Sequence, residues 1–162
     1  TQRRAVQTAL LALEAAGVPE EESLRCLRSC DGLREVHRGC LDGRSLTDPE
    51  VLADWRAAWA TVTPVDGGNR EDFRPCKDAE TYNELLLRAA KALEQLVDAQ
   101  QGPVWVFAHC CTIRVLVWNM LGVRADTHPL HLQNCSLTTV ERELQSAWHV
   151  VEMNDTSHMH AV

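Results

Sequence analysis

The sequence lacks any apolar run that approaches the roughly 18–20 residues a membrane-spanning helix requires. It also lacks a block of Lys and Arg that offsets its carboxylates, and the formal charge of the 162 residues is −7. These two absences argue against a membrane-spanning protein and against a nucleic-acid-binding one. No signal peptide is visible, and the chain begins at Thr1 rather than Met. We therefore expect a cytoplasmic protein from which an N-terminal piece is absent.

The seven cysteines lack a framework, because their number is odd and their spacing irregular. A secreted scaffold stabilised by disulfides usually has an even set, so we expect reduced thiols, most of them acting as small buried hydrophobes. One alternative is a zinc site, because three thiols and an imidazole fall close together, at Cys26, Cys30, His37 and Cys40. Their spacing is not a common zinc-finger pattern. We therefore predict no metal.

The pattern of hydrophobic residues, which make up 45% of the chain, predicts one α/β domain over residues 1–162. Helices are expected over residues 2–16, from Pro49 after the N-cap Asp48, over 79–100 and over 112–121. Strands are expected over 104–108, 136–141 and 147–153. Residues 20–47 are predicted to be irregular, with weak strand potential at 24–27. Residues 63–75 are predicted to form a loop. Thr81 and Glu84 are a candidate capping box, although Asp78 is an equally good cap.

The segment VWVFAHCCTIR, residues 104–114, carries the clearest functional signal. A short apolar run reaches His109 and then turns into a helical pattern that Gly122 closes. This pattern predicts a buried strand followed by a histidine at the N-terminus of a helix. Unpaired N–H groups and the helix dipole make that position favourable for an anion, and an imidazole there can exchange protons with it. The segment therefore predicts a phosphate pocket.

Six segments in order resemble motifs of the histidine phosphatase superfamily, which includes the cofactor-dependent phosphoglycerate mutases. TQRRAVQTA (1–9) is similar to S-x-L-x-R-A-x-Q-T-A, LREVHRGCLDGRS (33–45) to L-x-E-x-x-x-G-x-x-[ED]-G, and AHCCTIRVL (108–116) to G-H-G-G-x-I-R. AETYNELLLRAAKAL (79–93) resembles G-E-S-x-x-E-L-x-x-R, LQNCSLTTVE (132–141) resembles L-x-N-x-S-x-T, and NDTSHM (154–159) resembles the usual tail. The resemblance implies a three-layer helix–sheet–helix fold of the phosphoglycerate mutase type.

The resemblance also assigns roles to individual residues. Arg4 would hold the phosphate with its guanidinium fork, and His109 would donate to the same phosphate and stabilise the transition state. Glu35 stands where the family often has the proton donor to the leaving oxygen. Thr112 and the amides after His109, including that of Cys110, would complete the phosphate cradle. For Arg114 we favour a structural ion pair over a ligand role. No cofactor is implied.

Two departures from the family pattern stand out. Cys110 and Cys111 replace a glycine pair, which narrows the approach to the phosphate and puts two thiols at a helix N-terminus, where a thiol pKa tends to fall. We still favour ordinary packing for both over a redox switch. More important, the family's nucleophile is the histidine of an R-H-G motif on a first central strand, and no such tripeptide occurs in the 162 residues. We therefore expect the first central strand to be missing and this chain alone to be inactive and poorly stable.

The functional prediction is a phosphomonoester hydrolase that works through a phosphohistidine in the full-length protein. Its partner is a small phosphorylated substrate, with specificity supplied by residues 48–80. The compact stretch 36–108 favours a phosphatase over phosphotransfer of the phosphoglycerate mutase type. A second alternative is a non-catalytic pseudoenzyme that binds a phosphorylated partner through Arg4 and His109. The remaining histidines are expected to lie at the surface or in satisfied core positions, and His158 with His160 in a solvated tail.

Overall fold

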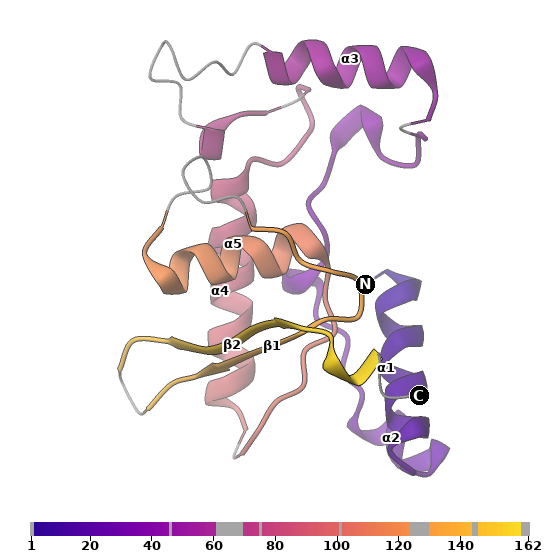
Figure 1. Cartoon of the computed structure of the whole chain (residues 1–162), viewed down its shortest axis with the longest axis vertical. Helices are drawn as coiled ribbons and strands as arrows, with labels where there is room; N and C mark the ends of the chain where they lie inside the picture. The colour runs from indigo at the N-terminus through magenta and orange to yellow at the C-terminus, as the bar shows by residue number, and fades with distance from the viewer. Residues whose placement is uncertain are drawn as a thin grey trace.

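The computed structural model describes residues 2–45, 47–60, 70–74, 76–100, 102–123, 130–143 and 146–159. Its main helices are α1 (Arg3–Ala15), α2 (Glu20–Cys26), α3 (Pro49–Ala60), α4 (Tyr82–Asp98) and α5 (Cys110–Leu121). The strands are β1 (Leu137–Glu141) and β2 (His149–Asp155), and 3-10 turns occur at Asp31–Leu33, Gly39–Leu41, Arg70–Asp72 and Ser157–Met159. In Figure 1, α5 crosses α4, and α1 and α2 lie together at the side where α5 begins.

The predicted helix boundaries follow from their caps. The Thr81 side chain accepts a bond from the Glu84 amide, and the Glu84 carboxylate accepts one from the Thr81 amide, so the capping box is confirmed. The Asp48 carboxylate accepts from the Glu50 amide at the start of α3. Gly122 ends α5 in the left-handed region, with φ +63°. Local capping chemistry was therefore sufficient to place these ends.

The core lies where α4 and α5 cross. One buried cluster joins these helices to the 3-10 turn Asp31–Leu33, and a second extends the contact toward Tyr82. Their buried members are Leu33, Leu85, Ala89, Ala92, Leu93, Val115, Leu116 and Trp118. Gly32 lies directly against Ala92, and a Cβ at Gly32 would overlap the Ala92 side chain. This close approach fixes the chain just before Glu35 on α4.

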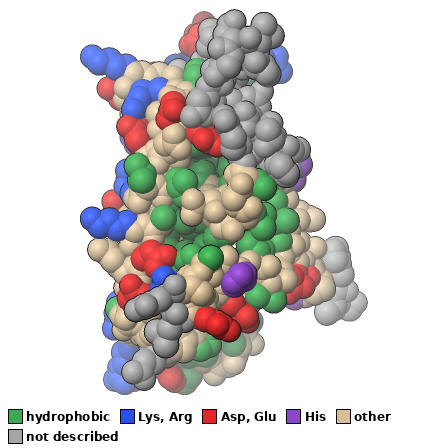
Figure 2. All heavy atoms as spheres, turned by 90° about the vertical axis from the view of Figure 1, so that its left-hand side faces the viewer, with side chains coloured by type: hydrophobic (Ala, Val, Ile, Leu, Met, Phe, Trp, Pro, Cys, Tyr) green, Lys and Arg blue, Asp and Glu red, His purple; other side chains and the backbone are tan. Residues whose placement is uncertain are grey.

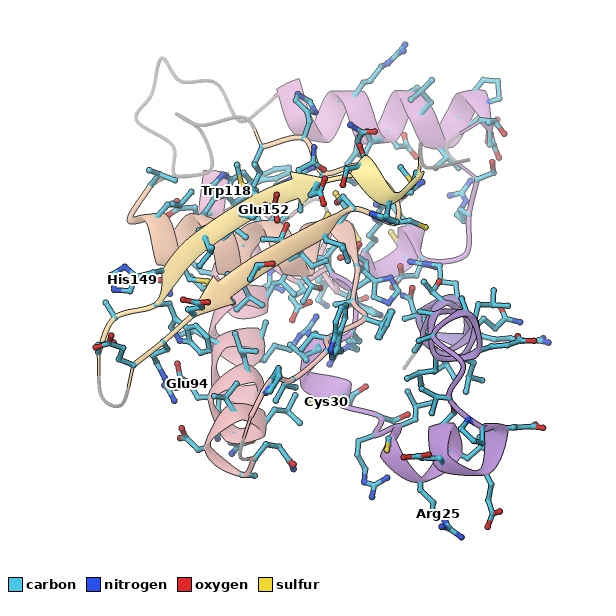
Figure 3. All side chains as sticks on the ribbon, turned by 60° about the horizontal axis from the view of Figure 1, so that its bottom comes forward. Arg25, Cys30, Glu94, Trp118, His149 and Glu152 are labelled. Atoms are coloured by element: carbon cyan, nitrogen blue, oxygen red, sulfur yellow. The ribbon has the colours of Figure 1, made fainter. Side chains whose placement is uncertain are left out.

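The two predicted C-terminal strands form an antiparallel hairpin, and β1 and β2 are confirmed. Its register pairs Val140 with Val150, with irregularities nearer the start of β1. The side chain of Arg142 bonds to Glu94 and Asp98 of α4, and the Trp148 indole donates to Glu94 at 2.7 Å. Figure 3 shows Glu94 on α4 and His149 on β2, near the turn end of the hairpin. These contacts fasten the hairpin to the helices.

Two expectations about secondary structure were wrong. Residues 20–26 form α2 rather than an irregular segment, because three acidic residues occupy its first turn and Glu21 pairs with Arg25 one turn later. Residues 104–108 form no strand, and the described residues contain a single sheet of two strands, β1 and β2. A strand needs a hydrogen-bonded neighbour, and the described residues offer none there. Trp105, which lies in the segment predicted to be a buried strand, is 73% exposed.

Hydrophobic and charged side chains occupy different parts of the surface. Figure 2 shows hydrophobic side chains gathered at the centre of one face, with charged side chains around them. Among the histidines, His37, His131, His149 and His158 are exposed, as expected, whereas His128 and His160 lie outside the described residues. Most of the expected loop 63–75 also lies outside them. Within the described part of the chain, every helix is too short or too polar to cross a lipid bilayer.

Candidate active site

His109 occupies the position immediately before α5. Its backbone is extended (φ −124°, ψ 158°), and its side chain is 7% exposed and forms no bond that caps the helix. Burial lowers the pKa of His109, and the positive charge of Arg4 lowers it further, while the Glu35 carboxylate acts in the opposite direction. These effects favour the neutral form of the imidazole, which lies near one cation and one carboxylate.

Glu35 reaches the same helix end from an irregular segment. Its Oε2 accepts from the Cys111 amide at 3.3 Å, and its Oε1 accepts from the Val36 amide at 2.9 Å and the Thr112 hydroxyl at 3.4 Å. A carboxylate at this position satisfies a first-turn amide that has no partner within the helix. The structure thus brings Glu35 and His109, which are 74 positions apart in the sequence, to the N-terminus of α5.

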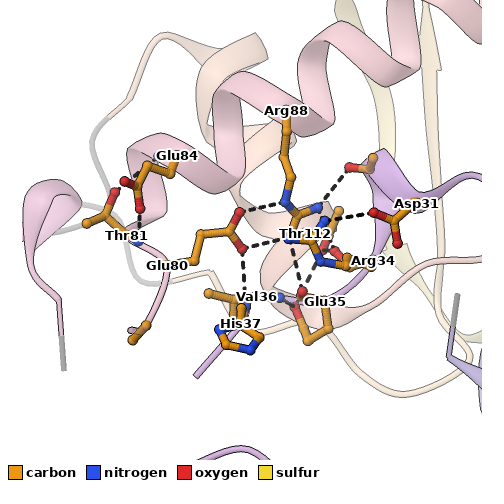
Figure 4. Close-up of polar contacts among 12 residues, drawn as sticks. Asp31, Arg34, Glu35, Val36, His37, Glu80, Thr81, Glu84, Arg88 and Thr112 are labelled. Atoms are coloured by element: carbon orange, nitrogen blue, oxygen red, sulfur yellow. Dashed lines mark hydrogen bonds and ion pairs between the residues drawn. The ribbon is translucent and has the colours of Figure 1, made fainter. Parts of the chain in front are cut away.

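Arg88 holds the segment that carries Glu35 (Figure 4). Its guanidinium donates to the carbonyls of Gly32 at 2.8 Å, Arg34 at 3.0 Å and Glu35 at 3.0 Å. It also pairs with both carboxylate oxygens of Glu80, at 2.5 and 2.7 Å. The Arg88 and Glu80 side chains are only 18% and 10% exposed. Because residues 34–37 have no regular structure, this ion pair takes the place of a strand or helix in positioning them.

Glu80 completes the attachment on the other side of the segment. Its Oε2 accepts from the His37 amide at 3.1 Å, and its own amide donates to the His37 carbonyl at 2.7 Å. The role of the Arg88–Glu80 pair was not assigned from the sequence. A signal for it was nevertheless present, because both residues fall on the Glu and Arg of the G-E-S-x-x-E-L-x-x-R resemblance.

The remaining predicted phosphate ligands lie as follows. Arg4 is exposed on α1 and acts electrostatically on His109. Thr112 is fully buried, and its hydroxyl donates to the Arg34 carbonyl at 2.8 Å. Cys110 is the first residue of α5, and its sulfur accepts from the Arg114 guanidinium at 3.2 Å. All three lie at or close to the helix end.

None of the seven cysteines is fully buried, so the expectation that most of them are buried hydrophobes is wrong. Burial, together with the nearby Glu35 charge, raises the pKa of Cys111 to about 11, so it is not activated by its place at a helix N-terminus. Cys40 and Cys76 are hydrogen-bonded neighbours that are 36 positions apart in the sequence. The four residues of the alternative zinc set are not gathered: Cys30 packs against the core and Cys40 lies beside Cys76. Among the described residues, no cluster of His, Cys, Asp or Glu could hold a metal ion.

A cavity of about 330 Å³ opens beside the N-terminus of α5. Aromatic side chains from three separate segments line it, namely Trp55, Phe73 and Tyr82, together with Glu35, Glu80, Cys110 and Cys111. Among the described residues, Arg38 and Arg114 also line it. The ion pair expected for Arg114 is not formed among the described residues; its guanidinium instead lies 5.7 Å from the centroid of the Trp118 ring.

A buried histidine, a carboxylate and nearby arginines thus lie around one helix N-terminus of a helix-rich α/β scaffold. The chain belongs to the histidine phosphatase superfamily (branch 1), whose family model matches residues 1–156. The fold agrees with the structure of Bacillus stearothermophilus YhfR at a TM-score of 0.77 and 20% sequence identity. That match covers 98% of this chain and 73% of the YhfR chain. None of the curated proteins matches the chain.

Proposed function

We propose that the full-length protein hydrolyses a small phosphomonoester through a phosphohistidine intermediate. The observation that carries this proposal is the position of His109, buried at the N-terminus of α5 with Glu35 beside it and Arg4 within electrostatic reach. A first helical turn presents unpaired amides, which favour a phosphate at that end.

Each residue then has a distinct role. Arg4 and His109 bind the transferred phosphoryl group and stabilise the charge that develops on it. The Cys110 amide contributes from the first turn, as does the amide of Thr112, whose hydroxyl is already engaged by the Arg34 carbonyl. Glu35 protonates the leaving oxygen, after which water attacks the phosphohistidine and releases phosphate.

The nucleophile of this scheme belongs to an R-H-G segment upstream of Thr1, which pairs with residues 104–108 as the first central strand of a helix–sheet–helix fold. Two apolar side chains of that run support the pairing, because Trp105 is 73% and Val106 38% exposed here. An apolar extended run with unpaired backbone groups favours a neighbouring strand. The 162 residues alone are then expected to turn over phosphomonoesters negligibly.

The experiment measures binding and turnover separately in the 162-residue chain. Inorganic phosphate, titrated by NMR, is expected to shift the signals of His109 and of the first turn of α5. His109→Ala and Arg4→Gln weaken this binding, whereas His131→Ala, a change at an exposed histidine, leaves it intact. Failure of the unchanged chain to bind phosphate would refute the site. Turnover of p-nitrophenyl phosphate at ordinary enzyme rates, lost in His109→Ala, would refute the upstream nucleophile.

A phosphatase is preferred over a mutase because water needs no second substrate pocket and residues 36–108 are compact. The pseudoenzyme alternative predicts that phosphate binds equally well but that no R-H-G segment precedes Thr1 in the native chain. Top-down mass spectrometry of the native protein decides between the two.

A further inference from the structure

The cavity beside α5 contains two guanidinium groups that lack carboxylate partners. Among the residues that the structure describes, neither Arg38 nor Arg114 forms an ion pair. The Arg114 Nε is completely buried and donates to no described residue, and its Nη2 reaches only the Cys110 sulfur. Arg114 as a whole is half-buried, but its Nε has lost contact with water without gaining an acceptor, which is costly for a charged group.

Arg38 lines the same cavity from a different segment of the chain, just after Glu35. Its guanidinium lies 5.5 Å from the centroid of the Trp55 ring, and Trp55 also lines the cavity. The charges of both arginines act on Tyr82 and Cys111, which places the two guanidinium groups around one small region. Two carboxylates line the cavity, but each has other partners: Glu80 pairs with Arg88, and Glu35 accepts from the Val36 and Cys111 amides.

The rest of the lining is suited to a flat apolar group. Trp55 comes from α3, Phe73 follows the turn Arg70–Asp72, and Tyr82 begins α4, so three rings from separate elements meet at one cavity. Tyr82 is partly buried against the core of α4 and α5, and this burial raises the pKa of its hydroxyl to about 12. A volume near 330 Å³ suits a small molecule rather than a macromolecule.

We propose that this cavity selects phosphomonoesters whose organic part is an aromatic ring bearing a second anionic group. The rings of Trp55, Phe73 and Tyr82 pack on the aromatic part, and the guanidinium groups of Arg38 and Arg114 bind the second anion. The cavity shares Glu35, Cys110 and Cys111 with the helix end, so one molecule reaches both. This inference rests on the proposed phosphate site and adds the class of its substrate.

The test compares three non-hydrolysable probes on the 162-residue chain by titration calorimetry: inorganic phosphate, phenylphosphonate and 4-carboxyphenylphosphonate. The ring is expected to improve binding over phosphate, and the carboxylate to improve it by a further factor of about ten or more. Arg114→Gln and Arg38→Gln each remove that second gain while leaving phenylphosphonate binding nearly unchanged. Arg56→Gln changes the same charge at an exposed position of α3 outside the cavity and keeps the gain.

The outcomes separate the two proposals. If the unchanged chain binds 4-carboxyphenylphosphonate no better than phenylphosphonate, or if the gain survives both arginine variants, the substrate class is wrong. Phosphate binding that still depends on His109 in that case leaves the proposed function standing. Arg114→Lys is a second variant in case Arg114→Gln unfolds. It keeps the positive charge but not the planar guanidinium, so we expect it to retain part of the affinity gained from the carboxylate. Arg38→Gln provides the same test at the second guanidinium of the cavity.

Discussion

Replacing Arg88 with Met is expected to destabilise the fold and displace Glu35 together. The change leaves the Glu80 carboxylate, which is 10% exposed, with the His37 amide as its remaining partner. It also removes the donors to the carbonyls of Gly32 and Glu35. Breaking a buried ion pair by deleting one partner costs about 3–5 kcal/mol. Since whole domains are stable by about 5–15 kcal/mol, such a loss is a large fraction of the total.

Urea unfolding followed by tryptophan fluorescence measures this loss, and phosphate titration of the same variant measures the site. The matched control is Arg25→Met, because Arg25 pairs with Glu21 on α2 where both side chains are largely exposed. That exposed i,i+4 pair is expected to contribute only about 0.3–0.5 kcal/mol. The double variant Arg88→Met with Glu80→Gln is expected to lose less than the sum of the two single losses. Equal, small losses of stability for Arg88→Met and Arg25→Met would refute the role of Arg88 in holding the segment that carries Glu35.

Two further predictions concern the backbone near Glu35 and the titration of His109. Gly39→Ala is expected to lose more stability in urea than Gly43→Ala: both have positive φ, but a Cβ at Gly39 would lie 2.5 Å from the Cys76 sulfur and 2.6 Å from the Ala79 nitrogen, whereas nothing lies near Gly43. Equal losses would mean that the close approach is wrong. Folding lowers the pKa of His109. As the pH is lowered through about 6.5, the unfolded chain therefore binds more protons than the folded one, and the free energy of unfolding decreases. His109→Gln is expected to weaken this dependence of stability on pH. Bound phosphate is expected to raise the pKa of His109 measured by NMR. An unchanged pKa in the presence of phosphate would contradict an anion at the imidazole.

What the sequence predicts well here is local. The capping box at Thr81 and Glu84, the stop at Gly122 and the hairpin of β1 and β2 depend on residues close together in the chain, and all three are confirmed. Helix α2 is equally local, but its evidence lies in charges rather than in hydrophobic spacing. Its acidic first turn and the Glu21–Arg25 pair stabilise a helix whose hydrophobic pattern is weak.

Contacts between distant segments could not be predicted in the same way. The bonds from Arg88 to residues 32–35 join positions more than 50 apart, and propensity or periodicity carries no information about them. The strand predicted over 104–108 depends on a neighbour that local sequence cannot supply. For Cys111, the helix N-terminus suggested a lowered pKa, but burial is the larger effect and raises it. For the segment 104–108 and for Cys111, tertiary surroundings therefore outweigh the local sequence pattern.

The two halves of the candidate site are therefore held by different means. His109 is fixed from its C-terminal side by α5, whose first turn is anchored when Thr112 donates to the Arg34 carbonyl. Glu35 is fixed from the side of α4, through Arg88 and Glu80. Both attachments meet in the backbone of residues 34 and 35, because Arg34 accepts from Thr112 and from Arg88 at once. A change at Arg88 must consequently reach His109 as well as Glu35, and loss of phosphate binding in Arg88→Met should exceed what the loss of the Glu35 side chain alone produces in Glu35→Gln.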